Sequence, residues 1–384
     1  MRMSAQQSDG TGYFIYHSIG QYPGKAGDLS RAMGEFAKIW GAADDGQWGH
    51  VLERRAQFVE HWRHLIGAPQ GSVTTCENVT AGLYSLIGAL PEADLRGRRV
   101  LVAGDCFPSL HFLLAGLQER FGFVLDTVAL RPGASWVEDE DVIAQWGPDV
   151  GMALLTWVSS TSSHRCDLER LVAHGRAQGS LIGVDITQAA GLLPFDVARP
   201  AVDFCVSTSL KWMCGTPGAG ILQVAPALIA RAQPEFRGWF SQQNPFSWAL
   251  DAFDYAADIR RFDNGTPAVV PAIASLPAMQ WHARQDHAAM LAHNRALCAR
   301  LIDGFDAVGA PVLSPRDPGA RGGSVMVRAP QDVAAPAILE RLRAVGVHAD
   351  ARDTVLRFSP GIMTTEAGVA RLFDALSGLW RGRG

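Results

Sequence analysis

Short apolar segments alternate with amphipathic segments through the middle of this chain. The apolar segments have the length of buried strands and lie at residues 99–103, 124–128, 150–155, 181–184 and 204–206. Between them are stretches with one apolar face, such as residues 167–176. This alternation predicts an α/β fold with a mostly parallel sheet, right-handed crossovers and helices on both faces.

The pattern changes after about residue 270. A long helical region is expected at residues 273–305, followed by strand candidates at 323–327 and 355–358. We therefore expect a large domain over residues 26–272 and a smaller α+β C-terminal domain over residues 273–384. The N-terminal segment, residues 1–25, is expected to pack near the small domain.

The composition narrows the class of protein. The chain has 384 residues, of which 48% are hydrophobic and 19% charged, as in ordinary soluble globular proteins. A formal charge of −4 gives no electrostatic reason to expect nucleic acid or an anionic membrane as a partner. No apolar stretch approaches the ~18 residues of a membrane span, and the N-terminus lacks the apolar core of a signal peptide.

The cysteines bear on the redox compartment and on metal binding. The six cysteines show no CxxC pairing, so neither a disulfide framework nor a zinc site is expected. We predict a cytoplasmic protein that holds no metal.

Lys211 and Asp185 are the leading candidates for chemistry. Lys211 follows the strand at 204–206 and precedes a glycine-rich turn at 215–220, while Asp185 ends the strand at 181–184. The chain has only two other lysines, Lys25 and Lys38, so lysine is not a common surface residue in this protein. Strand ends of a parallel sheet meet at one edge, where ligands bind. A lysine that forms a Schiff base and an acid that pairs with a pyridinium nitrogen together predict pyridoxal phosphate as cofactor.

Further candidates for holding that cofactor lie on neighbouring segments. Residues 78–83 precede a helical stretch expected at 84–90, and a helix N-terminus suits a phosphate. Phe107 could stack on the pyridine ring, Thr156 could bond its oxygen, and Gln188 could share the rim with Asp185. Ser209 is a candidate because it lies beside Lys211. The alternatives are a simple capping threonine at residue 80, a core phenylalanine, and ordinary turn residues at 156 and 188.

Several motifs together resemble a known family. They are Ile15–Gly20, Val79–Leu83, Phe107–Ser109, Asp185–Gly191, Lys211 with its GTPG turn, Gly238–Phe240, Gly265–Pro267 and Asp350–Phe358. With them the chain resembles the kynureninase branch of the class V enzymes that depend on pyridoxal phosphate. The resemblance runs from Ile15 nearly to the C-terminus and implies fold type I.

The resemblance also implies residue roles. Lys211 would carry the Schiff base and move protons, and Asp185 would pair with the pyridine nitrogen. Val79 and Thr80 would hold the phosphate, and Phe107 would stack on the ring. Trp239 and Thr266 would reach the cofactor of the second subunit in a homodimer with shared active sites. Arg357 would bind the α-carboxylate of an amino-acid substrate, because a guanidinium matches a carboxylate in two parallel hydrogen bonds.

The chain departs from kynureninases next to the proposed chemistry. Leu210 stands where kynureninases have tyrosine, Gln188 where they have histidine, and Leu110 where they have aspartate. The lost tyrosine hydroxyl removes a candidate acid or base.

Two enzymatic hypotheses follow. One is a kynureninase-like lyase or hydrolase that cleaves at the β-carbon, and the other is amino-group transfer or other α-carbon chemistry. A cysteine desulfurase is disfavoured because no cysteine follows Cys298. A non-catalytic relative is a further hypothesis, and the presence of Lys211, Asp185 and Arg357 argues against it.

Overall fold

A seven-stranded sheet of order β1-β7-β6-β5-β4-β2-β3 forms the centre of the computed structural model, which describes residues 12–380. Its strands are β1 (Val73–Cys76), β2 (Arg99–Ala103), β3 (Val124–Val128), β4 (Val150–Thr156), β5 (Leu181–Asp185), β6 (Phe204–Thr208) and β7 (Gly220–Val224). Strands β2 to β6 pair in parallel, whereas β7 runs antiparallel to both of its neighbours, β1 and β6. The mostly parallel sheet expected from the sequence is confirmed.

Helices cover both faces of this sheet. They are α1 (Lys25–Trp40), α2 (Gln47–Leu65), α3 (Val79–Ile87), α4 (Glu92–Leu95), α5 (Pro108–Phe121), α6 (Asp139–Gln145), α7 (Leu168–Gln178), α8 (Pro226–Ile229) and α9 (Val269–His282). Successive strand residues point to opposite faces. Leu101 therefore packs in the core shared with α2, α7 and α9, while Val100 and Val102 pack in the core shared with α3, α5 and α8. Burial on both faces explains why β2, β4, β5 and β6 are largely apolar runs.

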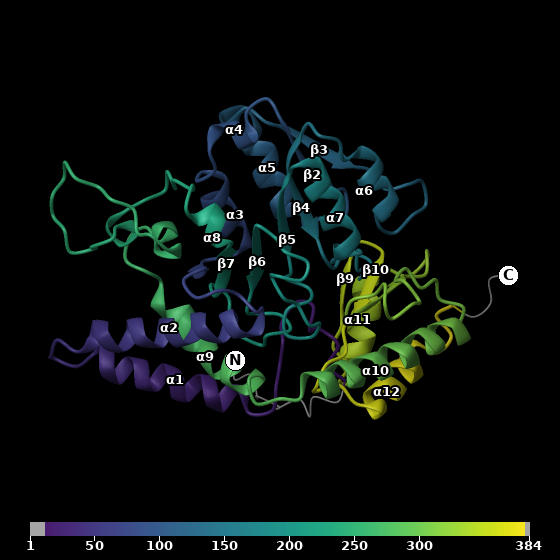
Figure 1. The fold of residues 1–384 in the computed structure, drawn as a ribbon. Coiled ribbons are helices and arrows are strands. Elements are labelled where there is room, and N and C mark those ends of the chain that lie inside the picture. The colour runs from purple at the N-terminus through teal and green to yellow at the C-terminus, as the bar shows by residue number, and fades with distance from the viewer. Residues whose placement is uncertain (1–11, 381–384) are drawn as a thin grey trace.

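A second, antiparallel sheet of order β8-β10-β9 lies beside the first. It consists of β8 (Val325–Arg328), β9 (Asp350–Arg352) and β10 (Val355–Phe358), with helices α10 (His287–Ala307), α11 (Ala335–Ala344) and α12 (Glu366–Leu376). Figure 1 shows these helices grouped around β9 and β10, on the opposite side of the molecule from α1 and α2. Their apolar faces form a separate core centred on Phe305, Leu356 and Leu372.

The chain before α1 joins this smaller core. Phe14 is fully buried in it, and bridges link Tyr13 with His348 and Ile15 with Ser359. Residues 1–11 of the expected N-terminal segment lie outside the described residues. The expected boundary at residues 272–273 falls inside α9, which packs on α1 and α2. We propose that the large domain extends to the end of that helix.

Four details differ from the sequence prediction. The helix expected at 84–90 begins at Val79, because the Asn78 side chain caps it by accepting a hydrogen bond from the Ala81 amide at 2.9 Å. The helical region at 273–305 is two helices, with Asp286 capping the second. The strand expected at 323–327 begins at Val325. Strands β1, β7 and β9 were not predicted.

Within residues 12–380, no helix is both long and apolar enough to cross a membrane. The same residues contain no cluster of three or more histidine, cysteine, aspartate or glutamate side chains suited to a metal ion.

Candidate active site

The carboxyl ends of three neighbouring strands bring the main candidates together. In the parallel register Thr156, the last residue of β4, lies opposite Asp185, the last residue of β5. Asp185 in turn lies opposite Val206 of β6. Lys211 follows the end of β6 in a turn that the Ser209 amide closes by donating to the Ala219 carbonyl at 3.0 Å. Both proposed anchors therefore lie at one edge of the sheet, as the sequence predicted.

A cavity of about 700 Å³ opens at this edge. It is lined by seven of the predicted residues, which are Val79, Thr80, Phe107, Thr156, Asp185, Gln188 and Lys211. Apolar side chains complete much of the wall, among them Leu113, Val158 and Leu210. The volume falls within the ~300–1,000 Å³ typical of sites for small molecules and cofactors.

Lys211 and Asp185 perturb each other inside this cavity. Burial lowers the pKa of the Lys211 amine to about 8; the carboxylate of Asp185 opposes this lowering, whereas Arg357 and Arg352 add to it. Burial raises the pKa of the Asp185 carboxyl, against the hydrogen bond from the Thr187 amide at 2.9 Å and the charge of Lys211. A lysine with such a pKa is partly unprotonated near neutral pH, which is the form that attacks an aldehyde.

One hydroxyl group in the cavity has no hydrogen-bond partner. Oγ1 of Thr156 is buried and finds neither an acceptor nor a donor among the described residues. A buried hydroxyl without a partner is costly, so it calls for a polar ligand atom. Thr156 therefore fits a group that presents an oxygen or ring substituent beside Asp185.

The N-terminus of α3 borders the same cavity. Asn78 caps this helix, and the next two residues, Val79 and Thr80, line the cavity. The first amide groups of a helix have no partner within it and carry a partial positive charge. This end of the cavity therefore suits a phosphate, and the phosphate-binding roles of Val79 and Thr80 stay predictions.

Phe107 presents an aromatic face to the lysine. It is the N-cap residue of α5, its side chain is 43% exposed, and its ring centroid lies 5.3 Å from Lys211 Nζ. An aromatic ring this exposed at a cavity wall is available for stacking on a planar ligand. The alternative of a core phenylalanine is excluded by that exposure.

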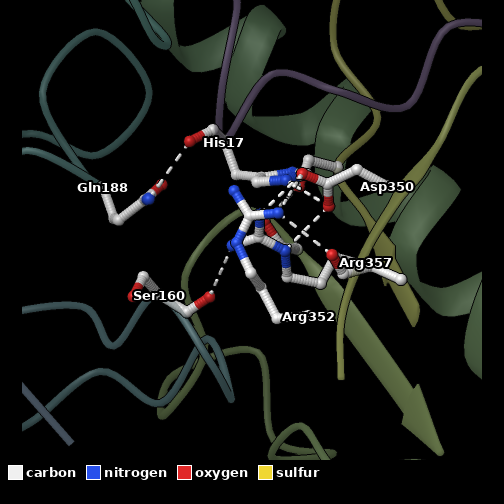
Figure 2. A network of polar contacts seen from close by, with 9 residues as sticks. His17, Ser160, Gln188, Asp350, Arg352 and Arg357 are labelled. Carbon is white, nitrogen blue, oxygen red and sulfur yellow. Dashed lines mark hydrogen bonds and ion pairs between the residues drawn. The ribbon is translucent and has the colours of Figure 1, made fainter. Parts of the chain in front are cut away.

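Arg357 lies behind the cavity wall rather than in it. Its Nε and Nη2 donate to the two oxygens of Asp350, and its Nη1 donates to the Ser160 carbonyl at 3.3 Å. Ser160 lines the cavity, so this contact links Arg357 to the cavity wall. Figure 2 shows this network, in which Arg357, Asp350 and His17 lie together and Gln188 reaches the His17 backbone.

Three other predicted residues lie outside the cavity of this chain. Ser209 is fully buried and its Oγ accepts a hydrogen bond from the Trp62 indole at 3.1 Å, while Thr208 lines the cavity in its place. Trp239 is 37% exposed and Thr266 is also exposed. The predicted roles of Trp239 and Thr266 require a second subunit and stay predictions.

Some site residues, and some contacts within the site, were not predicted. Ser160, Thr187 and Thr208 line the cavity, and His17 and Asp350 hold Arg357. Position at a strand end was an available signal for Thr208 and Thr187. No local signal links His17 with Asp350, because they meet only through the folding of the two chain ends together.

Comparison with known proteins agrees with this geometry. The family model described as Aminotransferase class-V matches residues 50–372. A kynureninase of Deinococcus radiodurans is 27% identical over 366 residues, covering 86% of this chain and 85% of the relative. An isopenicillin N epimerase of Streptomyces clavuligerus is 27% identical over 337 residues, covering 84% of each. A cysteine desulfurase of Thermococcus onnurineus superposes with a TM-score of 0.86 at 17% identity, covering 100% of this chain and 99% of that one.

Proposed function

This chain belongs to the aminotransferase class-V family, and we propose that it acts on an amino acid by means of pyridoxal phosphate held at Lys211. The observation that carries the proposal is the pairing of Lys211, whose pKa is lowered to about 8, with buried Asp185 in one cavity. The fold is fold type I, in keeping with the kynureninase-like pattern of the sequence.

Residues of the cavity match each polar group of this cofactor. Val79 and Thr80 at the start of α3 would hold the phosphate, Asp185 the pyridine nitrogen and Thr156 the ring oxygen. Phe107 would cover one face of the ring. When bound, pyridoxal phosphate supplies an electron sink for negative charge that develops on a substrate carbon.

The chain's own groups then have separate tasks. The Lys211 amine would hold and release a proton near the substrate carbon, which suits a pKa close to neutral. The carboxylate of Asp185 would favour a positive charge on the neighbouring ring nitrogen. Leu113, Val158 and Leu210 would exclude water from the reacting atoms and strengthen these electrostatic interactions.

For the reaction itself we propose kynureninase-like cleavage at the β-carbon, by a lyase or hydrolase mechanism. The Deinococcus relative and the Asp350–Phe358 motif with its buried Arg357 support this assignment. Arg357 would bind the α-carboxylate and so orient the Cα–Cβ bond.

Chemistry confined to the α-carbon, such as amino-group transfer, is the second candidate. Leu210 supports it, because this side chain lines the cavity directly beside Lys211 and supplies no hydroxyl for a second proton transfer. The epimerase relative, as similar as the kynureninase, supports it too. A cysteine desulfurase is disfavoured: the desulfurase superposition concerns the fold alone, and no cysteine follows Cys298, which is fully buried.

We also propose that the enzyme is a homodimer with shared active sites. Trp239, Phe246, Trp248 and Leu250 form an exposed apolar segment, with Leu250 fully exposed and Trp248 84% exposed. Apolar side chains gathered in this way favour burial against another protein surface. Size-exclusion chromatography with light scattering should give twice the chain mass of 41.3 kDa.

The reaction is tested by adding L-kynurenine to the cofactor-loaded protein and measuring anthranilate and L-alanine. Formation of both products, lost in Lys211→Ala, is the expected result. If the visible spectrum shows bound cofactor but L-kynurenine stays intact, β-cleavage of kynurenine is wrong. Conversion of L-alanine to pyruvate, or exchange of its α-hydrogen with deuterium from solvent, would then support the second candidate.

A further inference from the structure

One edge of the Arg357 guanidinium is fully used within the chain. Nε donates to Asp350 Oδ1 at 2.7 Å and Nη2 donates to Asp350 Oδ2 at 2.6 Å. Both residues belong to adjacent strands, β10 and β9, where Arg357 lies opposite Asp350 in the register. Two parallel charge-assisted hydrogen bonds fix the plane of a guanidinium as well as its position.

Asp350 is itself held by His17. Its Oδ1 lies 2.9 Å from His17 Nε2, on a side chain that is almost completely buried. Burial opposes ionisation of Asp350, but the hydrogen bonds from His17 and Arg357 outweigh it and lower the pKa of this carboxyl. An ionised carboxylate only accepts, so His17 must carry its hydrogen on Nε2.

The other ring nitrogen of His17 is held as well. His17 Nδ1 lies 2.6 Å from Ser359 Oγ, and Ser359 Oγ lies 2.6 Å from Ser324 Oγ. Burial lowers the pKa of His17 to about 4, so the ring is neutral and its Nδ1 accepts from Ser359. Ser324 then donates to Ser359, and this chain of three buried side chains fixes the imidazole in one tautomer and one orientation.

These contacts decide which edge of Arg357 remains for a ligand. Nη1 donates to the Ser160 carbonyl at 3.3 Å, and Ser160 lines the cavity. Asp350 takes the Nε hydrogen and one hydrogen of Nη2, so the remaining outward hydrogens of Nη1 and Nη2 have no acceptor among the described residues. A carboxylate can take both outward hydrogens in a second bidentate pair.

We propose that His17 and Asp350 are positioning residues that present the Nη1–Nη2 edge of Arg357 to the substrate α-carboxylate. This inference rests on the proposed function, because it assumes that Arg357 binds that carboxylate. Asp350 also neutralises Arg357 when no substrate is bound, so the arginine can be buried without an unpaired charge.

His17 also connects Arg357 and Asp350 with the wall of the cavity in which the cofactor is proposed to bind. Its backbone carbonyl accepts a hydrogen bond from Gln188 Nε2 at 3.1 Å, and Gln188 lines the cavity. The segment before α1 thereby ties the small sheet, through Asp350, to the carboxyl end of β5, through Gln188.

The test compares two probes on the cofactor-loaded enzyme. L-alanine carries the α-carboxylate and ethylamine lacks it, and the binding of each is followed by the change in visible absorption. In Asp350→Asn the affinity for L-alanine relative to ethylamine should fall about tenfold, the effect of losing a charge-assisted contact. His17→Asn should lower the same ratio about threefold, since it acts one step further away. A loss of folding would weaken the binding of both probes alike, so the ratio is read only in variants that bind ethylamine as the wild type does.

Controls separate the inference from the proposed function. Asp353→Asn removes the same charge from the exposed β9–β10 turn and should leave the ratio as it is. Arg357→Ala should abolish the preference for L-alanine; if it does not, the role of Arg357 in the proposed function is wrong. If Arg357→Ala abolishes the preference but Asp350→Asn and His17→Asn keep it, or Asp350→Asn binds L-alanine more tightly, the positioning role is wrong.

A readout without cofactor completes the test. With ¹⁵N-labelled histidine in the cofactor-free protein, the Nε2–H proton of His17 should give a slowly exchanging signal that is lost in His17→Asn and shifted in Asp350→Asn. The signal in Asp353→Asn should match that of the wild type. A His17 proton found on Nδ1 instead would contradict the arrangement.

Discussion

Replacing Lys211 with methionine should stabilise the cofactor-free protein. Burial lowers the pKa of Lys211 from 10.5 to about 8, so the folded chain holds the ammonium form less well than the unfolded chain does. Each pKa unit corresponds to about 1.36 kcal/mol, and at pH 7 the burial of this charge costs about 3 kcal/mol of unfolding free energy. Methionine has a similar length and no charge, so Lys211→Met should recover most of that amount.

The pH dependence identifies the cause. Between pH 8 and 10.5 the unfolded chain binds more protons at this lysine than the folded chain, so the stability of the wild type rises with pH in this window. The advantage of Lys211→Met should therefore fall from about 3 kcal/mol at pH 7 to about 1.4 kcal/mol at pH 9.5.

Urea unfolding of both proteins at equal concentration measures this difference. Lys38→Met, the same change at an exposed residue of α1, should alter stability by less than about 0.5 kcal/mol at either pH. If Lys211→Met is not more stable than the wild type, or if its advantage is equal at the two pH values, the amine of Lys211 is not buried.

Three further outcomes are expected. Thr156→Val should leave the stability of the cofactor-free protein nearly unchanged, since Oγ1 has no partner there, but weaken pyridoxal phosphate binding about three- to tenfold in a fluorescence titration; unchanged affinity would remove Thr156 from the site. Asp185→Asn should lower the pKa of Lys211 below about 8, because the carboxylate favours the ammonium form, and ¹³Cε-lysine NMR can follow the titration. If the pKa of Lys211 rises instead, Asp185 does not stabilise the ammonium form. Arg357→Ala should raise KM for the amino acid about tenfold or more with a smaller effect on kcat, as measured by steady-state kinetics. An unchanged KM would exclude Arg357 from the substrate-binding site.

Strands β2, β4, β5 and β6 could be predicted because they are buried on both faces and therefore stand out as short apolar runs. Their order along the chain places Asp185 and Lys211 at one edge. Strand β1 is less apolar, because its Thr74 and Thr75 side chains accept hydrogen bonds from Arg55. Its sequence therefore lacks the apolar run that predicts a buried strand. The start of α3 depends on the Asn78 cap, which lies five or more residues before the most apolar part of the helix.

The contacts that join Arg357, Asp350 and His17 could not all be predicted from the sequence. Arg357 and Asp350 belong to one motif and one β-hairpin, so their proximity is local. His17 reaches them only because the chain before α1 bridges to His348 and Ser359, from the other end of the sequence. Contacts of this range depend on how the two sheets pack, and a single sequence carries no periodic signal for them.

One experiment can identify the lysine that binds the cofactor. The protein would be incubated with pyridoxal phosphate, reduced with borohydride to make the lysine–cofactor link permanent, digested and analysed by mass spectrometry. Because the chain has only three lysines, the result is unambiguous. We expect one phosphopyridoxyl group per chain, on Lys211. A label on Lys25 or Lys38 with Lys211 unmodified, or no stoichiometric label at all, would contradict this expectation.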